Sequence, residues 1–229
     1  MYKIDNIENN KNLSMTAISM REMSEEKSAF FIIEQKTPVY PEVGIQRQIL
    51  CDINKYPVAT QQNMLQWSVG EIAVIPPGKK GIGEREATVK PIYAGKGFVM
   101  LKPTTDYLIV LRTADWIQEQ LTVDDMYFVA CDDGLKKQLK PKNNLSSAVA
   151  AGRGQNALGV SGKGIVIIKS PVPENMLTTI RMEKDVLCVE EGKLLAWSSQ
   201  LIFSVDAQED GSGKYMYTLR GSGRAILLP

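Results

Sequence analysis

The sequence offers few side chains that could do chemistry near neutral pH. Its 229 residues include no histidine, which excludes Ser–His–Asp and Cys–His catalysis and zinc sites with imidazole ligands. The three cysteines, Cys51, Cys131 and Cys188, form no CxxC pair, which argues against a structural zinc or a thioredoxin-like site. Cys131 and Cys188 lie in apolar runs, where we expect buried, reduced thiols. We therefore expect no enzyme, no catalytic residues, no metal and no cofactor.

Two pairs of adjacent carboxylates could act as acid–base catalysts or as metal ligands. Asp124-Asp125 and Glu190-Glu191 each fall between apolar runs, where a hairpin turn is expected. No further ligand type recurs beside them, so we expect solvated turn acids. An enzyme that uses carboxylates alone, such as a glycoside hydrolase, would need two of them about 5–9 Å apart in a cleft, and the sequence gives no sign of that geometry.

Positive charge gathers in one part of an otherwise balanced chain. The net charge is +1, which predicts no global attraction to nucleic acid or to anionic membranes. Residues 134–173 nevertheless contain no Asp or Glu. The residues expected to contact an anion or a nucleic acid there are Lys136, Lys137, Lys140, Lys142, Arg153 and Lys163. The alternative interpretation is a solvated loop and strand edge, because lysines at sheet edges block unwanted pairing.

The elements that would position these side chains are mostly short strands. Runs rich in Val, Ile, Leu and Tyr recur about every 8–12 residues between turn signals, which is typical of an all-β fold. One minor helix is expected near Asn144–Ala151, with Gly152 just past its end. The expected strands are 98–101, 107–111, 126–131, 164–169, 176–181, 186–189, 194–198, 201–205, 215–220 and 225–228. Residues 64–67 and 71–75 form two further short apolar runs.

A Gly-x-Gly motif followed by an apolar run occurs three times. The glycines are Gly95 and Gly97, Gly162 and Gly164, and Gly221 and Gly223. The first two copies are offset by 162 − 95 = 67 residues. Glycine at such positions permits a tight turn or bulge where a Cβ atom would clash. We predict a polar lead-in at 1–27, a degenerate β unit at 28–93 and two further β units at 94–160 and 161–229, which can pack as one continuous domain.

The order of these motifs resembles the altered-inheritance-of-mitochondria (mitochondrial biogenesis) family. The resemblance covers residues 92–229 and rests on the Gly-x-Gly strands, on Leu194-Leu195-Ala196-Trp197 and on the closing segment 219–227. It implies duplicated β-sandwich units of the TRAP-like, double-stranded β-helix type, similar to the trp RNA-binding attenuation protein, which assembles into rings. It brings no catalytic residues, and the RNA-contacting residues of the attenuation protein have no motif match here.

These observations favour a non-catalytic scaffold or interaction module that forms a homo-oligomer, with a trimer or ring as the simplest assembly, and that can take a protein partner. The alternative is binding of nucleic acid or of a phosphate ligand through residues 134–173. Trp67, Trp116 and Trp197 could stack on bases, although packing in cores is the commoner use of such residues. No run approaches about 18 apolar residues, so we expect no membrane span, and we expect a cytoplasmic location.

Overall fold

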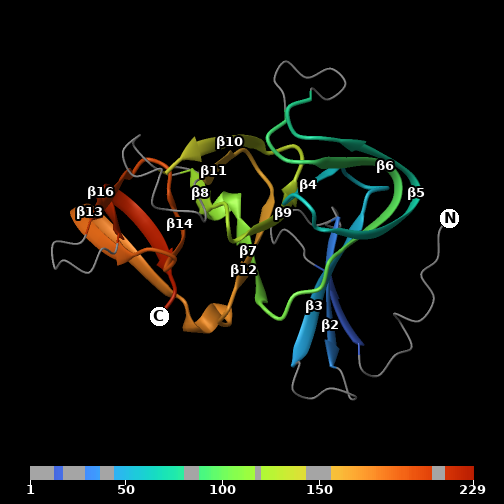
Figure 1. Cartoon of the computed structure of the whole chain (residues 1–229), viewed down its shortest axis with the longest axis horizontal. Coiled ribbons are helices and arrows are strands. Elements are labelled where there is room, and N and C mark those ends of the chain that lie inside the picture. Colours follow the sequence, from blue (N-terminus) through green and yellow to red (C-terminus); the bar gives the residue numbers. More distant parts are fainter. Residues whose placement is uncertain are drawn as a thin grey trace. The chain divides into compact units, whose positions relative to one another are not determined.

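The computed structural model describes residues 13–17, 29–36, 44–79, 88–116, 120–142, 156–207 and 215–229. Most of these residues lie in the strands of two sheets (Figure 1), and their helical segments are short 3-10 turns at Thr113–Trp116 and Glu174–Met176. The all-β prediction is confirmed. The helix expected near 144–151 lies outside the described residues.

The first sheet has nine strands around an apolar core that includes Phe30, Ile49, Leu101, Val129 and Ile167. Its order is β1 (Leu13–Ala17), β2 (Phe30–Lys36), β3 (Ile45–Asp52), β6 (Ile92–Leu101), β4 (Val58–Thr60), β9 (Phe128–Asp132), β12 (Ile165–Ser170) and β7 (Tyr107–Arg112). The ninth strand, β5 (Leu65–Ile75), pairs with β6. Because β6 has neighbours on both sides, it is central and its second half is almost fully buried.

The second sheet has seven strands, and its core includes Leu194, Trp197, Tyr217, Leu219 and Ala225. Its order is β10 (Lys136–Pro141), β11 (Asn156–Ser161), β8 (Leu121–Asp124), β14 (Leu194–Ser198), β16 (Tyr215–Leu227) and β13 (Thr178–Glu190). The seventh strand, β15 (Ile202–Ala207), also pairs with β16. All five residues of β14 are buried, because this strand lies between β8 and β16.

The chain divides into two compact units that are interleaved in sequence. Unit 1 comprises residues 1–112, 129–134 and 164–171, and unit 2 comprises residues 113–128, 135–163 and 172–229. The segment between residues 94 and 171 therefore supplies strands to both sheets. The boundaries at 93/94 and 160/161 stay a prediction about repetition in the sequence.

Two long strands were each expected to be two short ones, and a third was expected as two separate apolar runs. Residues 64–67 and 71–75 join in β5, residues 176–181 and 186–189 in β13, and residues 215–220 and 225–228 in β16. The glycines within β5 and β16 have positive φ but stay inside the ladder. Gly70 (φ 110°) pairs with Gly97, and Gly221 (φ 120°) pairs with Asp185 beside a bulge. A positive φ bends such a strand without ending it.

The repeated glycine pairs do not all have the same local structure. Gly95 and Gly97 lie within β6, and Gly221 and Gly223 lie within β16, all with positive φ. Gly162 lies in a bend between β11 and β12, which belong to different sheets, and Gly164 ends that bend. Gly95 and Gly162 are therefore not structurally equivalent, although their offset in the sequence had suggested that they are. The reason is that a Gly-x-Gly motif before an apolar run is compatible both with a bent strand and with a turn between strands.

Candidate functional site

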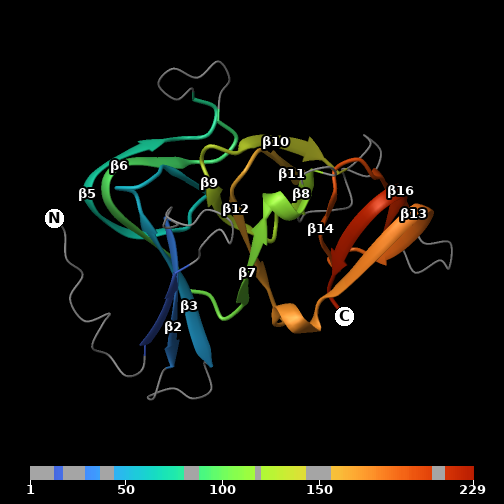
Figure 2. The ribbon, with the colours of Figure 1, turned by 180° about the vertical axis from the view of Figure 1, so that it is seen from behind.

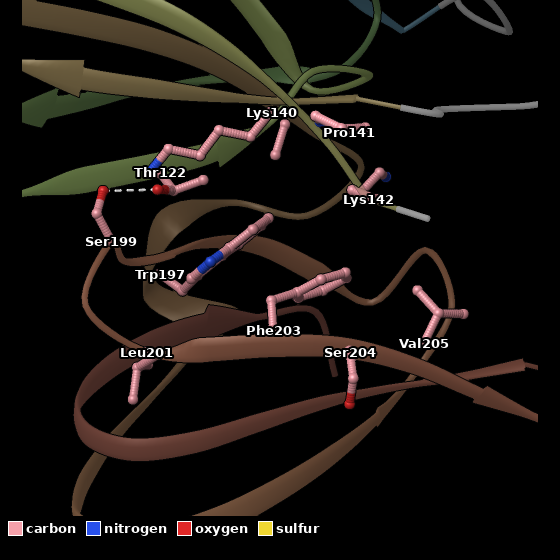
Figure 3. Close-up of a pocket in the computed structure, with 11 residues that line it drawn as sticks. Thr122, Lys140, Pro141, Lys142, Trp197, Ser199, Leu201, Phe203, Ser204 and Val205 are labelled. Carbon is pink, nitrogen blue, oxygen red and sulfur yellow. Dashed lines mark hydrogen bonds between the residues drawn. The ribbon is translucent and has the colours of Figure 1, made fainter. Parts of the chain in front are cut away.

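A pocket of about 170 Å³ lies in unit 2 (Figure 3). The residues that line it come from β8, β10, β11, β14 and β15 and from the chain just after β10 and just before β15. They are Thr122, Lys140, Pro141, Lys142, Ala157, Trp197, Ser199, Leu201, Phe203, Ser204 and Val205. No carboxylate side chain occurs among these eleven lining residues, so the charges they carry are both positive.

Aromatic side chains form one wall of the pocket. The Trp197 and Phe203 rings are stacked, with centroids 5.3 Å apart and an interplanar angle of 17°. The Phe203 ring also lies 5.1 Å from the Tyr217 ring at an angle of 59°. Trp197 is buried on β14, so burial of its neighbours fixes the orientation of the indole. This wall is a rigid flat surface, which suits a planar apolar group.

The opposite wall carries the Lys140 side chain, which extends along the pocket toward Thr122 in Figure 3. Lys140 lies on β10 and crosses the neighbouring strand at Gly159. A Cβ atom at Gly159 would lie 2.9 Å from Lys140 Cε, so the glycine provides the space for this side chain. Within the described parts of the chain, the Lys140 ammonium has neither a hydrogen bond nor an ion pair.

Two hydroxyl groups lie beside Lys140. Thr122 Oγ1 and Ser199 Oγ are 2.6 Å apart and share a hydrogen bond in which either can be the donor. Because each hydroxyl has one proton, the group that accepts this bond keeps its own proton for another acceptor. The pair can therefore donate to a ligand oxygen near the ammonium.

A buried ion pair lies at the edge of the pocket. Lys142 Nζ donates to Asp124 Oδ2 at 2.6 Å, and the two side chains are 3% and 1% exposed. Lys142 Nζ also donates to the Tyr217 hydroxyl at 3.3 Å. Burial raises the pKa of the Asp124 carboxyl, and the Lys142 ammonium and the Met126 backbone amide oppose this shift. Lys142 is thus neutralised within the protein and is not a free anion contact.

The structure brings together two of the six basic residues predicted to contact an anion. Lys140 and Lys142 line the pocket. Lys136 is exposed on β10, Lys137 donates to the Leu135 carbonyl at 2.8 Å, and Lys163 is exposed in the bend after β11. Arg153 lies outside the described residues. The interpretation of residues 134–173 as one continuous basic patch is therefore too broad.

Two other expectations from the sequence are corrected here. Asp124 was expected to be a solvated turn acid but is fully buried, because it ends β8 and pairs with Lys142. Glu190 and Glu191 are exposed, as expected. Cys131 is buried as expected, whereas Cys188 is exposed because it lies on the largely exposed strand β13.

Several lining residues carried no functional signal in the sequence. Thr122, Ser199 and Phe203 suggested no binding role, and Trp197 suggested packing more than binding. Their proximity arises from the strand order, which places β8 between β11 and β14. A metal site built from three or more Cys, Asp or Glu side chains does not occur in the described part of the chain. The described residues also include no helix that is long and apolar enough to cross a membrane.

Comparison with known proteins identifies the family. The X-ray crystal structure of protein SPYM3_0169 from Streptococcus pyogenes is similar to this chain, with a TM-score of 0.59 and 16% sequence identity, over 95% of this chain and 93% of that one. At this identity the similarity shows the fold alone. The chain matches no curated protein. Residues 56–228 match the family described as Mitochondrial biogenesis AIM24, and the chain therefore belongs to this family.

Proposed function

We propose that this chain is a non-catalytic interaction module that assembles with further copies of itself into a closed ring. The observation that carries the proposal is one long, largely exposed strand in each unit, β5 in unit 1 and β13 in unit 2. Each of them pairs on one side only among the described strands.

Strand β5 is an unusually apolar edge. It follows β6 along its full length (Figure 1 and Figure 2), and eight of its 11 residues are exposed. Trp67, Val69 and Val74 are 37%, 38% and 51% exposed, and Glu71 is the strand's only charged residue. A long apolar edge with few charges is a template for pairing with another strand.

Strand β13 offers a second edge in unit 2, which is more polar than β5 because it carries five charged residues where β5 has one. It has 13 residues, pairs with β16, and exposes Val186 to 50%. A bulge between Met182 and Asp185 interrupts its register with β16. The edge therefore consists of two regular stretches on either side of the bulge.

The edges of β5 and β13 give every chain two different contact surfaces. A contact of β5 in one copy with β13 in the next is heterologous, and heterologous contacts close into rings when the rotation permits. The resemblance to the trp RNA-binding attenuation protein, which stays a prediction, makes a trimer the simplest ring. The second copy of the chain is thus the proposed partner for both edges.

The test is the mass in solution of the whole chain and of two variants, measured by size-exclusion chromatography with light scattering. The wild type should have a mass of at least three times 25.4 kDa. Val69→Lys on β5 and Val186→Lys on β13 should each give a monomer, because a lysine on an edge opposes pairing. Met176→Lys, an exposed residue on neither edge, is the matched control and should keep the ring.

Mixing the two variants separates a ring from a symmetric dimer. Each variant keeps one intact edge, so an equimolar mixture should give a dimer of one Val69→Lys chain and one Val186→Lys chain. A monomeric wild type contradicts the proposal. So does a mixture that stays monomeric, because then the two edges do not meet.

The alternative function is binding of nucleic acid or of a phosphate ligand by the remaining basic residues. It is supported by the position of Lys136 and Lys163 at one end of the β10–β11 ladder, where Lys136 pairs with Ser161. A titration with single-stranded RNA at two salt concentrations tests this function. Affinity should fall as salt rises and should fall in Lys136→Gln/Lys163→Gln. Affinity that changes in neither case contradicts this alternative.

We also propose a cytoplasmic location. Its support is that Cys51, Cys131 and Cys188 form no disulfide, as is usual in a reducing compartment. Fractionation of cells that produce the protein tests this location, and recovery with an exported fraction would contradict it.

A further inference from the structure

We infer that the pocket in unit 2 binds a small planar monocarboxylate, with its ring against Trp197 and Phe203 and its carboxylate on Lys140. This site is independent of the proposed ring, because none of its lining residues lies on β5 or β13. The argument rests on the size of the pocket, its net charge and the placement of its hydrogen-bond donors.

The volume of the pocket limits the ligand to about one ring. It measures about 170 Å³. An apolar cavity of about 150 Å³ holds one benzene molecule. The pocket thus accommodates a six-membered ring with a small substituent, and it is too small for a nucleotide. The stacked wall of Trp197 and Phe203 favours a planar ring over a puckered one.

The charge of the pocket selects a monoanion. Lys140 contributes one ammonium that has no polar partner in the described parts of the chain, whereas Lys142 is neutralised by Asp124 at 2.6 Å. A monocarboxylate balances the Lys140 charge. A dianion such as phosphate would find one free ammonium and would be repelled by the Asp124 carboxylate behind Lys142.

The donors converge where the carboxylate would lie. Figure 3 shows the Lys140 side chain directed toward Thr122, whose hydroxyl is hydrogen-bonded to Ser199. The hydroxyl that accepts this bond donates its own proton to one carboxylate oxygen, and Lys140 donates to the other. The apolar side chains of Ala157, Leu201 and Val205 then surround the ring.

Benzoate is the probe, and its binding to the full-length chain is measured by calorimetry and by the NMR signals of the tryptophan indoles. We expect a dissociation constant of about 1 mM or tighter, which is within reach of a ligand of about nine non-hydrogen atoms. Benzamide, which has the same shape without the charge, and acetate, which has the charge without the ring, should each bind at least about tenfold more weakly. The Trp197 indole signal should shift, and those of Trp67 and Trp116 should not.

Matched variants assign the binding to this pocket. Lys140→Met keeps an unbranched side chain of similar length but removes the ammonium, and it should weaken benzoate binding at least about tenfold. Lys163→Met makes the same change at an exposed position outside the pocket and should leave the affinity unchanged. Lys140→Gln provides a second variant if Lys140→Met fails to fold.

Three results would overturn the inference. They are an unshifted Trp197 signal at benzoate concentrations well above 1 mM, equal binding of benzoate and benzamide, and an equal loss of affinity in Lys140→Met and Lys163→Met. The outcome does not depend on ring assembly, because Val69→Lys should bind benzoate as the wild type does.

Discussion

The two units differ in what holds the centre of each together. Unit 1 is centred on an apolar cluster, and its β5–β6 ribbon brings backbones into contact at Gly70, Gly95 and Gly97. Unit 2 combines apolar packing with a stacked aromatic group and the buried ion pair of Asp124 and Lys142. At these places unit 1 depends on close backbone approach and unit 2 on specific polar contacts, although unit 1 also buries Lys90, whose Nζ donates to Gln61 Oε1 at 2.7 Å.

This difference predicts where each unit is sensitive to substitution. Apolar packing is non-directional and tolerates many changes of similar volume. A buried ion pair is sensitive to removal of one partner, because the remaining charge stays desolvated. A bent ribbon is sensitive at its glycines, because backbone atoms cannot move aside as side chains can.

The largest effect is expected for Lys142→Met in unit 2. The substitution leaves the Asp124 carboxylate buried without its cation, which should lower the free energy of unfolding at pH 7 by about 3–5 kcal/mol. Urea denaturation measures this loss. Adding Asp124→Asn to Lys142→Met should recover most of it, because the buried charge is then gone.

An ion pair of unit 1 provides the matched control. Arg47 Nε lies 2.7 Å from Glu34 Oε1, but the Glu34 side chain is 41% exposed. Glu34→Gln should therefore cost no more than about 1 kcal/mol. An equal loss in Glu34→Gln and Lys142→Met would show that burial does not distinguish the two pairs.

The next largest effect is expected at the glycines of the ribbons. A Cβ atom on Gly97 would overlap the Val69 carbonyl oxygen, whereas one on Gly221 would first meet Leu201 Cδ2 at 3.7 Å. Both positions have positive φ, so both substitutions are strained. Gly97→Ala should cost about 3 kcal/mol and Gly221→Ala about 1–2 kcal/mol, since only the first adds a backbone clash to the strain.

Urea denaturation of both variants measures this difference. Equal losses would mean that the φ angle alone sets the cost. A smaller loss for Gly97→Ala than for Gly221→Ala would contradict the close backbone approach in unit 1.

The sequence predicted the fold class but not which strands are continuous. Leu194–Ser198 and Tyr107–Leu111 were expected as strands and occur as β14 and β7, because apolar runs between turn residues are local signals. The division of β16 was wrong, because a glycine in a ladder and a glycine in a turn have the same local sequence. The division of β13 was wrong because the polar segment between Met182 and Asp185 forms a bulge within the strand and not a turn. Whether pairing continues past Gly70 or Gly221 depends on the partner strand.

The site was less predictable, because its residues meet through strand order. Lys140 and Lys142 were expected to contact an anion, but nothing near Lys142 in the sequence indicates that Asp124, 18 residues earlier, neutralises it. Nor does any motif indicate that Gly159 makes room for Lys140. Charge composition therefore predicted a basic region. Only the order of the strands in the sheet shows that Lys142 pairs with Asp124 and that Lys140 does not.

The smallest effect is a dependence of stability on pH that originates in unit 2. Burial raises the pKa of the Asp124 carboxyl above its ordinary value of 3.8, so the folded state keeps this proton at pH values where the unfolded chain has lost it. The contribution to stability is fully present below pH 3.8 and is lost as the pH rises through the folded-state pKa. In Lys142→Met the cation that lowers this pKa is absent, so the loss should extend to higher pH.

Urea denaturation between pH 4 and pH 8 tests this dependence. The free energy of unfolding of Lys142→Met should rise as the pH falls. The reference is Lys142→Met/Asp124→Asn, which has no titrating group at position 124. The wild type should follow the same direction with a smaller change, because Lys142 opposes the shift. A stability difference between the two variants that stays constant with pH would mean that Asp124 is not desolvated. The contrast between the polar centre of unit 2 and the apolar centre of unit 1 would then lose its energetic basis.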